Sequence, residues 1–449
     1  YSSAASDVYK RQLSFNESET SQFVEETLKT GGRRSYGYDA HGNLVVVTEP
    51  NGGVWRLVYD GWGRLLSQTD PLGAETRYAY SPRGDLVSVR DAIGGVTRYG
   101  YDGERHLTHV VDAKGQVTAL TWGGYHRLCA RRDANGNEVR LRYNLEGELV
   151  EVYNERGEVH KLRYDPSGKL LGETTFDGRQ LAFRNDLAGR VVRSENGLRQ
   201  LTELEYDLAG QLVGRTLCDG SAETFEYDEN GEMVGAKSSA GELAFERDRL
   251  GRIVRETQVF GGREHWVEVA YDAAGERVGR KTSLGHTEQV TRDVLGERAR
   301  TVLDGHHAVD HRIDALGRET GRALPAGGWI QSAYDAMGRL SRRRAGGAPQ
   351  RRAAGPGEPE WVGAQTDGTR VDTAYRYDWD GELIESSDRA RGKTEYRYDP
   401  IGQLLAMVPE KARAELFRYD PAGNLYETGP EAEAREVGPG NRLLRKGDT

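Results

Sequence analysis

The stretch Leu162–Gly178 reads LRYDPSGKLLGETTFDG, and variants of its first half recur along the chain. YDAHGNL begins at Tyr38, YDGWGRL at Tyr59, YDLAGQL at Tyr206 and YDPIGQL at Tyr398. A motif that returns at a fixed interval is the mark of a repeat architecture, in which every copy forms the same structural unit. The interval between the copies therefore defines the structural unit.

The interval is 21 residues when the tyrosine of the motif is taken as an anchor. Steps differ from 21 only beside Arg247, where they are 20 and 24, and between Tyr334 and Tyr377, where the step is 43. A glycine stands four places after 16 of the 18 anchors, whereas 58 glycines in 449 residues would give about two by chance. The anchors are Tyr38, Tyr59, Tyr80, Tyr101, Trp122, Tyr143, Tyr164, Asn185, Tyr206, Tyr227, Arg247, Tyr271, Arg292, Ile313, Tyr334, Tyr377, Tyr398 and Tyr419.

Each repeat contains two turn signals separated by short strand-like segments. In Asp165–Gly168 the aspartate can bond the backbone two residues on, and the glycine tolerates a left-handed conformation. A similar turn follows about ten residues later, as in Asp70–Gly73 and Asp91–Gly94. The six or seven residues between turns are rich in Val, Tyr, Thr and Leu, which favours strands. Each repeat is therefore predicted to be one β-hairpin, with a bulge at the glycine.

Alternation of residue types supports strands over helices. Tyr78 and Tyr80 flank Ala79, and Leu204 and Tyr206 flank a glutamate. Successive residues of a strand point to opposite faces, so one face of the sheet is predicted to be apolar and aromatic and the other polar. An amphipathic helix would need apolar residues at three-to-four spacing and fewer glycines.

The composition agrees with a sheet that has much surface per residue. Only 36% of residues are hydrophobic and 30% are charged, and the mean hydropathy is −0.73. The net charge of −9 argues against a nucleic-acid partner, because phosphate contacts need clustered Lys and Arg. No apolar run approaches the roughly 18 residues of a membrane span. Cys129 and Cys218 are predicted to be free thiols in strands, with a disulfide between them as the alternative.

The recurrence of YDxxGRL every 21 residues resembles the YD-repeat, or RHS-repeat, family, and the match extends over nearly the whole chain from about Phe15. Tyr419–Leu425 and Gly440–Leu444 resemble the late part of the core of bacterial Rhs polymorphic toxins. The resemblance implies an all-β fold in which tandem hairpins form a long curved spiral sheet, part of a hollow cocoon.

The resemblance also implies a function. The chain would be a non-enzymatic shell segment that sequesters a toxic C-terminal domain of the same polypeptide, absent here, for delivery to competing cells by type VI or another secretion machinery. The protein would be cytoplasmic in the producer before export, and then secreted or delivered into the target cell. The alternative, suggested by the resemblance to animal teneurins, is an extracellular recognition scaffold that binds glycans or protein.

Four segments are expected. Residues 1–12 fit no repeat register and are predicted to be extraneous or disordered. Residues 13–341 form the repeat shell, residues 342–360 an Arg/Gly/Pro-rich insertion loop, and residues 361–449 a truncated continuation of the shell. A basic arm that binds nucleic acid is the alternative for the insertion. Because the chain starts with Tyr1 and stops within a repeat-like stretch, it is expected to be a fragment.

No catalytic, cofactor or metal site is predicted. Asp399 and Asp420 resemble the self-cleavage aspartate of bacterial Rhs proteins, but both belong to repeat turns and neither has Leu directly after the glycine. The stretch Asp133–Glu138 lacks the alternating acids of a calcium loop. The stretch Asp304–His311 gathers four residues that could bind a metal, but a turn is favoured there over a metal site. The four are His306, His307, Asp310 and His311.

The expected length of the sheet follows from the repeat count. Eighteen hairpins give 36 strands, and at about 4.8 Å a strand the ribbon would be roughly 170 Å long. Rolled once, it would have a diameter of roughly 55 Å.

Overall fold

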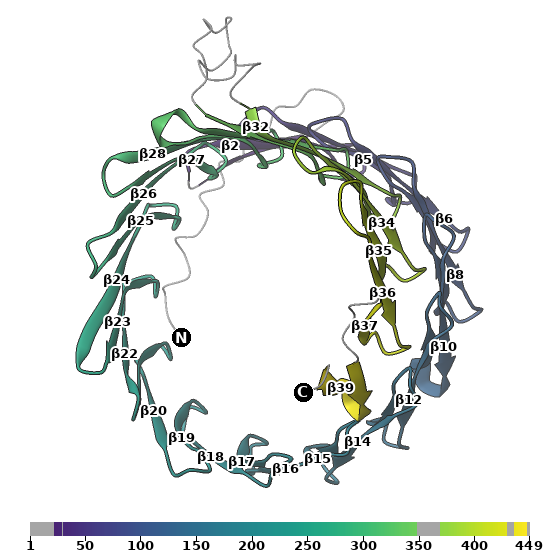
Figure 1. The fold of residues 1–449 in the computed structure, drawn as a ribbon, viewed down its shortest axis with the longest axis vertical. Coiled ribbons are helices and arrows are strands. Elements are labelled where there is room, and N and C mark those ends of the chain that lie inside the picture. The colour runs from purple at the N-terminus through teal and green to yellow at the C-terminus, as the bar shows by residue number, and fades with distance from the viewer. Residues whose placement is uncertain (1–21, 29, 348–368, 429–434, 447–449) are drawn as a thin grey trace, which may run out of the picture.

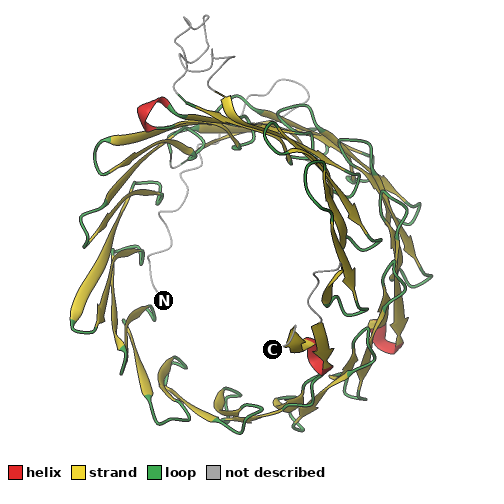
Figure 2. Cartoon of the chain, viewed as in Figure 1, coloured by secondary structure: helices red, strands yellow, loops and turns green. Residues whose placement is uncertain are grey.

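The computed structural model describes residues 22–28, 30–347, 369–428 and 435–446, and almost all of its regular structure is β-strand. Figure 2 shows a ring of strands and turns in which the helical segments are confined to single turns. The predicted all-β fold of hairpin repeats is therefore confirmed. No helix of the described residues is long and apolar enough to cross a membrane.

The first circuit and its continuation consist of short strands joined by tight turns. The elements are β1 (Gln22–Thr27), β2 (Arg33–Tyr38), β3 (Leu44–Thr48), β4 (Val54–Tyr59), β5 (Leu65–Thr69), β6 (Glu75–Tyr80), β7 (Leu86–Arg90), β8 (Val96–Tyr101), β9 (Leu107–Val111), β10 (Val117–Gly123), η1 (Gly124–His126), β11 (Arg127–Arg132), β12 (Glu138–Tyr143), β13 (Leu149–Tyr153), β14 (Val159–Tyr164), β15 (Leu170–Thr174), β16 (Gln180–Asn185), β17 (Val191–Glu195), β18 (Leu201–Tyr206), β19 (Leu212–Thr216), β20 (Ala222–Tyr227), β21 (Met233–Ser238), β22 (Gly241–Arg247), β23 (Ile253–Phe260), β24 (Arg263–Tyr271), β25 (Arg277–Thr282), β26 (Thr287–Arg292), β27 (Arg298–Leu303), β28 (His307–Ile313), β29 (Glu319–Ala323), η2 (Pro325–Gly327), β30 (Trp329–Tyr334), β31 (Leu340–Gly346), β32 (Thr369–Tyr377), β33 (Leu383–Asp388), β34 (Gly392–Tyr398), β35 (Leu404–Pro409), β36 (Glu415–Tyr419), β37 (Leu425–Thr428), β38 (Arg435–Gly438), η3 (Pro439–Asn441) and β39 (Arg442–Lys446).

Strands β1 to β37 form one continuous sheet in which every strand pairs antiparallel with its neighbour in sequence. Strands β38 and β39 form a separate two-stranded sheet. The pairing register slips by one residue at almost every anchor, as between Arg163 and Tyr164. The glycine four residues after the anchor has a positive φ, +81° at Gly168. This combination is the predicted type I turn with a glycine bulge.

The sheet winds past its own beginning. The hydroxyl of Thr30, in the β1–β2 turn, donates to the carbonyl of Val294 in the β26–β27 turn. One full circuit of the ring from this contact therefore contains the 25 strands β2 to β26. Lys114, in the β9–β10 turn, bonds Glu382 in the β32–β33 turn, so a circuit starting there contains β10 to β32, 23 strands. Figure 1 shows the later strands β34 to β37 nearer the centre than β6 to β12. The ribbon is therefore a spiral that narrows toward its C-terminal part.

The single-turn estimate of the ring is wrong for that reason. A circuit of 23 to 25 strands at about 4.8 Å each has a circumference of roughly 110–120 Å, hence a diameter of roughly 35–40 Å rather than 55 Å. The 37 strands make about one and a half circuits of this size. The sequence predicts the length of the ribbon well, but it holds no signal for the curvature.

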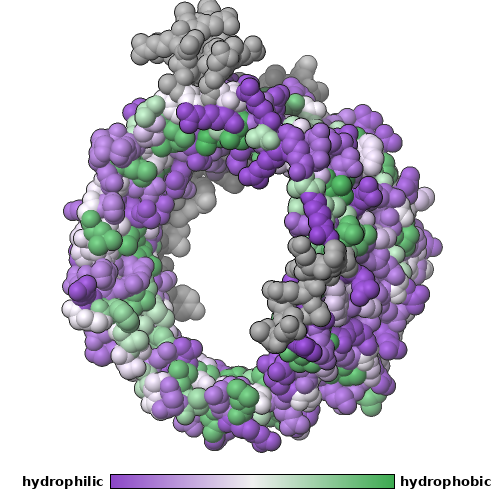
Figure 3. Space-filling view, in the orientation of Figure 1, coloured by the Kyte–Doolittle hydropathy of each residue, from purple (hydrophilic) through white to green (hydrophobic). Residues whose placement is uncertain are grey.

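The wall is a single layer with hardly any core. Among the described hydrophobic residues only Val290, Trp329 and Ala406 are buried, and none of the described side chains is fully enclosed. The accessible surface is 29158 Å², against roughly 17,000 Å² for a compact protein of this mass. Figure 3 shows hydrophobic patches scattered among hydrophilic residues around the ring, including on the surface that faces the opening. Stability therefore has to come from bonds along the sheet and its rims.

The sheet extends somewhat beyond the segment boundary predicted for the insertion. Strand β31 continues to Gly346 and pairs with β32, so residues 342–346 belong to the sheet rather than to a loop. Pairing resumes at Thr369. Residues 1–12, most of the predicted insertion and the expected resumption near Trp361 lie outside the described residues.

Candidate functional site: the rims and the seam of the wall

The first turn of most repeats is closed by its own aspartate; Ser81, Gly123 and Asn144 are the exceptions. In the turn after Tyr59, one carboxylate oxygen of Asp60 accepts the backbone N–H groups of Trp62 and Arg64 at 2.9 and 3.0 Å. The bond from the Arg64 backbone, then the Arg64 side chain, hold the pKa of Asp60 below its ordinary value despite partial desolvation. Gly63 follows with φ +74°. Aspartate and glycine are thus required by the backbone, which confirms the structural role predicted for them.

The anchor side chain bonds the neighbouring hairpin. The Tyr164 hydroxyl donates to the main-chain carbonyl of Leu149, the first residue of β13, at 2.9 Å. Strands β13 and β14 share only three residue pairs, and their pairing ends before it reaches the rim that holds Tyr164. The tyrosine therefore connects the two strands where backbone pairing is absent. Burial, together with nearby Glu148, raises the pKa of Tyr164. The same tyrosine bond recurs, at 2.8–3.1 Å, from Tyr101, Tyr143, Tyr206, Tyr227, Tyr271, Tyr334, Tyr377 and Tyr398.

Four anchors that are not tyrosine make an equivalent bond. Trp122 donates through Nε1 to Leu107, and Asn185 donates through Nδ2 to Leu170. The two arginine anchors also donate to the carbonyl of a residue in the preceding hairpin: Arg247 to Met233 and Arg292 to Arg277. The anchor position therefore selects a hydrogen-bond donor of sufficient reach. Interpreting it as merely apolar missed this role, although Trp, Asn and Arg at that position were a visible signal.

The arginine in YDxxGR joins successive repeats a second time. Arg64 bonds the carboxylate of Asp60 through Nε at 2.7 Å, and its guanidinium lies 5.0 Å from the centre of the Tyr80 ring in the next repeat. It also donates to the Ser81 carbonyl at 3.3 Å. Arg190 and Arg339 repeat all three contacts. Every consensus letter of the motif therefore has a partner in the backbone or in an adjacent repeat.

The second turns of the first circuit contact the first turns of the next circuit. We call this line of contact the seam. Its donors stand directly before the turn glycine, at the tip of each turn. Asn135 donates to the Asp399 carboxylate at 2.8 Å and Asn51 to the Ala315 carbonyl at 3.3 Å. Arg156 lies 3.6 Å from Asp420 and donates to the Gly438 carbonyl in β38.

Lys114 is the most strongly bound residue of the seam. Its ammonium lies 2.7 Å from Glu382, 3.0 Å from Asp378 and 3.9 Å from Asp380. Partial burial disfavours the charged amine, but the bonds to Glu382 and Asp378 outweigh it and raise the pKa of Lys114. Lys114 correspondingly lowers the pKa of Asp378, while burial beside a second carboxylate raises that of Glu382. One cation thus holds three acidic groups of the next circuit against the first.

The opposite rim of the first circuit carries exposed apolar side chains at its turn tips. These residues occupy first turns, and the second circuit does not cover them. They include Trp62 (86% exposed), Tyr125 (85%), Leu145 (97%), Leu187 (103%), Leu208 (108%) and Leu250 (77%). Corresponding tips in the second circuit meet the seam, and Val294 is only 48% exposed.

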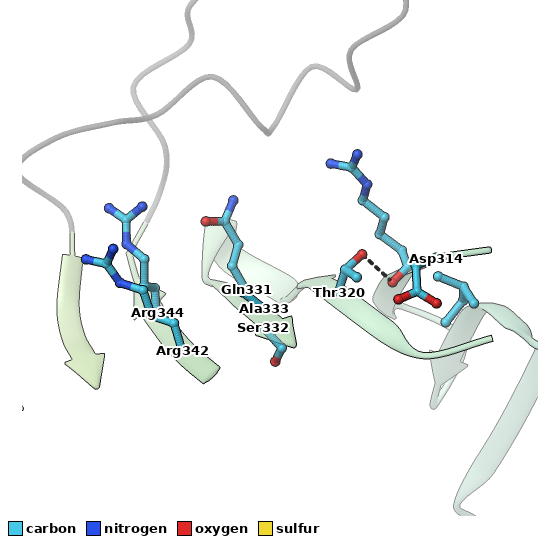
Figure 4. A pocket seen from close by; sticks show the side chains of 9 residues that line it. Asp314, Thr320, Gln331, Ser332, Ala333, Arg342 and Arg344 are labelled. Carbon is cyan, nitrogen blue, oxygen red and sulfur yellow. Dashed lines mark hydrogen bonds between the residues drawn. The ribbon is translucent and has the colours of Figure 1, made fainter. Parts of the chain in front are cut away.

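A basic pocket of about 470 Å³ opens over strands β28 to β31 (Figure 4). Gly321 of β29 pairs with Arg312 on one neighbouring strand and with Gln331 on the other. Because glycine has no side chain, the pocket opens between those two residues. Arg344 and Arg342 extend from β31 toward the same side as Gln331. Arg342 is already held by two bonds to Asp372 at 2.8 and 2.7 Å. The arrangement can bind an anion: the lining combines three arginines with the hydroxyls of Thr320 and Ser332, while its one carboxylate, Asp314, is held by Arg318.

The histidine group at positions 306–311 and the turn aspartates do not come together in one site. His306 lies in the β27–β28 turn with its ring tilted against that of His307. His307, Asp310 and His311 belong to β28, so the predicted turn holds only for His306. His311 bonds Glu319 and Thr301. Asp310 lies beside Arg300. Asp133, Asp399 and Asp420 cap their own turns, Asp399 also forming part of the seam. Cys129 and Cys218 are both free, and Cys129 lies in β11 as predicted, whereas Cys218 lies in the turn after β19 and not in a strand.

Comparisons with known proteins agree with a wall built in this way. The geometry defines a class, the shells made of YD repeats. The sequence profile of the Teneurin YD-shell family matches residues 7–193 and 179–343, about three quarters of the chain. The chain belongs to this family. No curated protein sequence matches it significantly.

Solved toxin structures share the fold. The TcdB2–TccC3 structure matches with a TM-score of 0.75 and 14% identity over 94% of this chain. The same complex without its hypervariable C-terminal region gives 0.75 and 14% over 94% of this chain. The Tc holotoxin pore from Photorhabdus luminescens gives 0.73 and 14% over 94%. This chain spans 28%, 26% and 27% of those three chains, respectively, so it corresponds to little more than a quarter of each.

Proposed function

We propose that the chain is a non-enzymatic segment of an Rhs-type toxin shell, which encloses a toxic C-terminal domain of the same polypeptide until delivery to competing cells. The observation that carries this proposal is the seam. Contacts such as Lys114 to Glu382 join the second circuit to the first wherever the two overlap, and a continuous wall is what containment needs. Figure 3 shows that the side chains leave the centre of the ring open in this view.

The route of the protein is part of the same proposal. The shell forms in the cytoplasm of the producer, and the loaded protein is then exported or injected. The similarity to a TcdB2–TccC3 complex solved without its hypervariable C-terminal region supports a cargo at that end. An extracellular recognition scaffold that binds glycans or protein is the second candidate, favoured by the match to the Teneurin YD-shell family.

The test is limited proteolysis of the polypeptide in which a C-terminal domain follows the repeats. Lys114→Glu places a fourth negative charge beside Asp378 and Glu382 and should open the seam. Leu198→Glu adds the same charge at the corresponding tip of a second turn that faces no circuit, where Leu198 is 77% exposed. We expect the cargo to resist protease in the wild type and in Leu198→Glu, and to be cut at least several-fold faster in Lys114→Glu.

Equal digestion of the cargo in the wild type and in a denatured control would rule out encapsulation and leave the recognition scaffold as the leading account. Protection that persists in Lys114→Glu although hydrogen exchange shows an opened seam would mean that the seam is not the barrier.

A further inference from the structure

Two adjacent first turns depart from the rule that governs the other sixteen. Arg105 and His126 stand where the repeat has glycine, and both have the left-handed φ values of +71° and +58°. The second of these turns also has Gly123 in place of the capping aspartate. Left-handed conformations are unfavourable for residues with a side chain, so these two turns forgo the stability that glycine supplies. The turns lie side by side on the rim of the first circuit, after β8 and after β10.

These turns bring three metal-binding side chains together. Glu104, His106 and His126 each offer one ligand atom, and the three atoms lie within 4.8 Å of one another. Nε2 of His106 faces Nδ1 of His126 at 2.5 Å, and a carboxylate oxygen of Glu104 lies 3.9 Å from that same Nδ1. Two lone pairs that face each other repel unless a proton or a cation lies between them.

The surroundings orient the central histidine as they do in metal sites. Nδ1 of His106 bonds the Asp102 carboxylate at 2.9 Å, which leaves Nε2 as the free nitrogen on the side of His126. The His106 ring stacks on Trp122 at 4.9 Å, and only 11% of the side chain is exposed. Trp122 is itself fixed by its bond to the Leu107 carbonyl. His126 and Glu104 are 70% and 74% exposed, so they can adjust around an ion.

We propose that Glu104, His106 and His126 bind a divalent transition-metal ion of the zinc class, with Asp102 as the carboxylate that orients His106. Two imidazoles and one carboxylate suit Zn²⁺, and three protein ligands leave a fourth position for water. The ligands come from two successive repeats, so the ion cross-links the β8–β9 and β10–β11 hairpins. It does so at the turn that has lost both its aspartate and its glycine.

The test exploits the repeat itself. His126→Gly removes a ligand and restores the glycine of the other turns, so the metal-free variant should unfold at a temperature no lower than the wild type. Zinc binding is measured by calorimetric titration with ZnCl₂ and by the rise of the unfolding temperature. We expect one zinc ion per chain and a rise for the wild type, at least a tenfold weaker affinity and no rise for His126→Gly, and roughly tenfold weaker binding for Asp102→Asn.

Two controls keep the result specific. Arg105→Gly restores glycine at the adjacent turn without touching a ligand and should keep the zinc response. His306→Ala disrupts the other histidine pair, in which the His306 and His307 rings lie 4.0 Å apart, and should keep it as well. The proposal is overturned if the wild type binds no zinc at micromolar concentration, if His126→Gly binds as well as the wild type, or if His306→Ala abolishes binding.

Discussion

Replacing Tyr164 by phenylalanine isolates the bond that ties one hairpin to the next. The change removes only the hydroxyl, which donates to the Leu149 carbonyl at 2.9 Å. A hydrogen bond of this kind contributes about 1 kcal/mol, because water competes for both partners when it is broken. At 25 °C about 1 kcal/mol corresponds to roughly a fivefold change in an opening equilibrium.

The assay is hydrogen exchange of the amides in β13 and β14, because repeat arrays open locally and a global unfolding curve would dilute the effect. We expect exchange there to accelerate about fivefold in Tyr164→Phe. Tyr153→Phe is the matched control, since the Tyr153 hydroxyl bonds Glu151 on its own strand and Arg142 on β12 of the same hairpin, and so joins no two hairpins. That variant should change exchange less than twofold.

The reverse substitution tests the same reasoning from the opposite side. Ile313 is an anchor without a donor, and Arg298 begins the preceding β27 just as Leu149 begins β13. Ile313→Tyr should slow exchange in β27 and β28. The reasoning is refuted if Tyr164→Phe behaves like Tyr153→Phe and Ile313→Tyr gives no added protection.

Three further outcomes follow from the turns and the seam. Gly42→Ala, at φ +82° with open space around it, should destabilise by about 1 kcal/mol in urea unfolding, whereas Gly61→Ala, also in open space but without a positive φ, should be near neutral. Hydrogen bonds lower the folded-state pKa of turn aspartates; that of Asp177 falls to about 2, chiefly through its bond with Thr175. The unfolded state therefore binds more protons in acid than the folded state does. The free energy of unfolding should then fall as the pH drops from about 4 toward 2, and Asp60→Asn, which keeps the acceptor, should reduce that slope. Asn135→Ala should raise exchange in the facing turn at Asp399 by about fivefold while leaving the first turns of the first circuit unchanged.

Sequence reasoning succeeds here where the determinants are local. The type I turn, the glycine bulge and the strand length all follow from residues within about ten positions of one another, as in Asp165–Gly168. The seam joins residues 264 positions apart, such as Asn135 and Asp399, and that pairing depends on the pitch of the spiral. Pitch arises from small rotations summed over 23 to 25 strands, so no local pattern encodes it.

The cluster of Glu104, His106 and His126 is intermediate between the local turns and the long-range seam. His106 and His126 are 20 positions apart, close to one repeat, and hence fall on the same rim in consecutive hairpins. Aligning the repeats would have placed them together, because positions 105 and 126 are the two that break the glycine rule. Considering histidines only where they cluster in sequence directed attention to His306 and His307 instead.

The same physics explains how the fold persists at low sequence identity. The bonds that define the wall end on backbone atoms: turn aspartates accept N–H groups, and anchors donate to carbonyls. Side chains on the two faces of a single-layer sheet have few buried neighbours to match, as the near absence of buried hydrophobic residues in the described part of the chain shows. The fold therefore depends chiefly on the anchor and the turn residues of each repeat. This accounts for a TM-score of 0.75 at 14% identity, and it means that loss of an anchor or turn residue should weaken one hairpin without unfolding the rest.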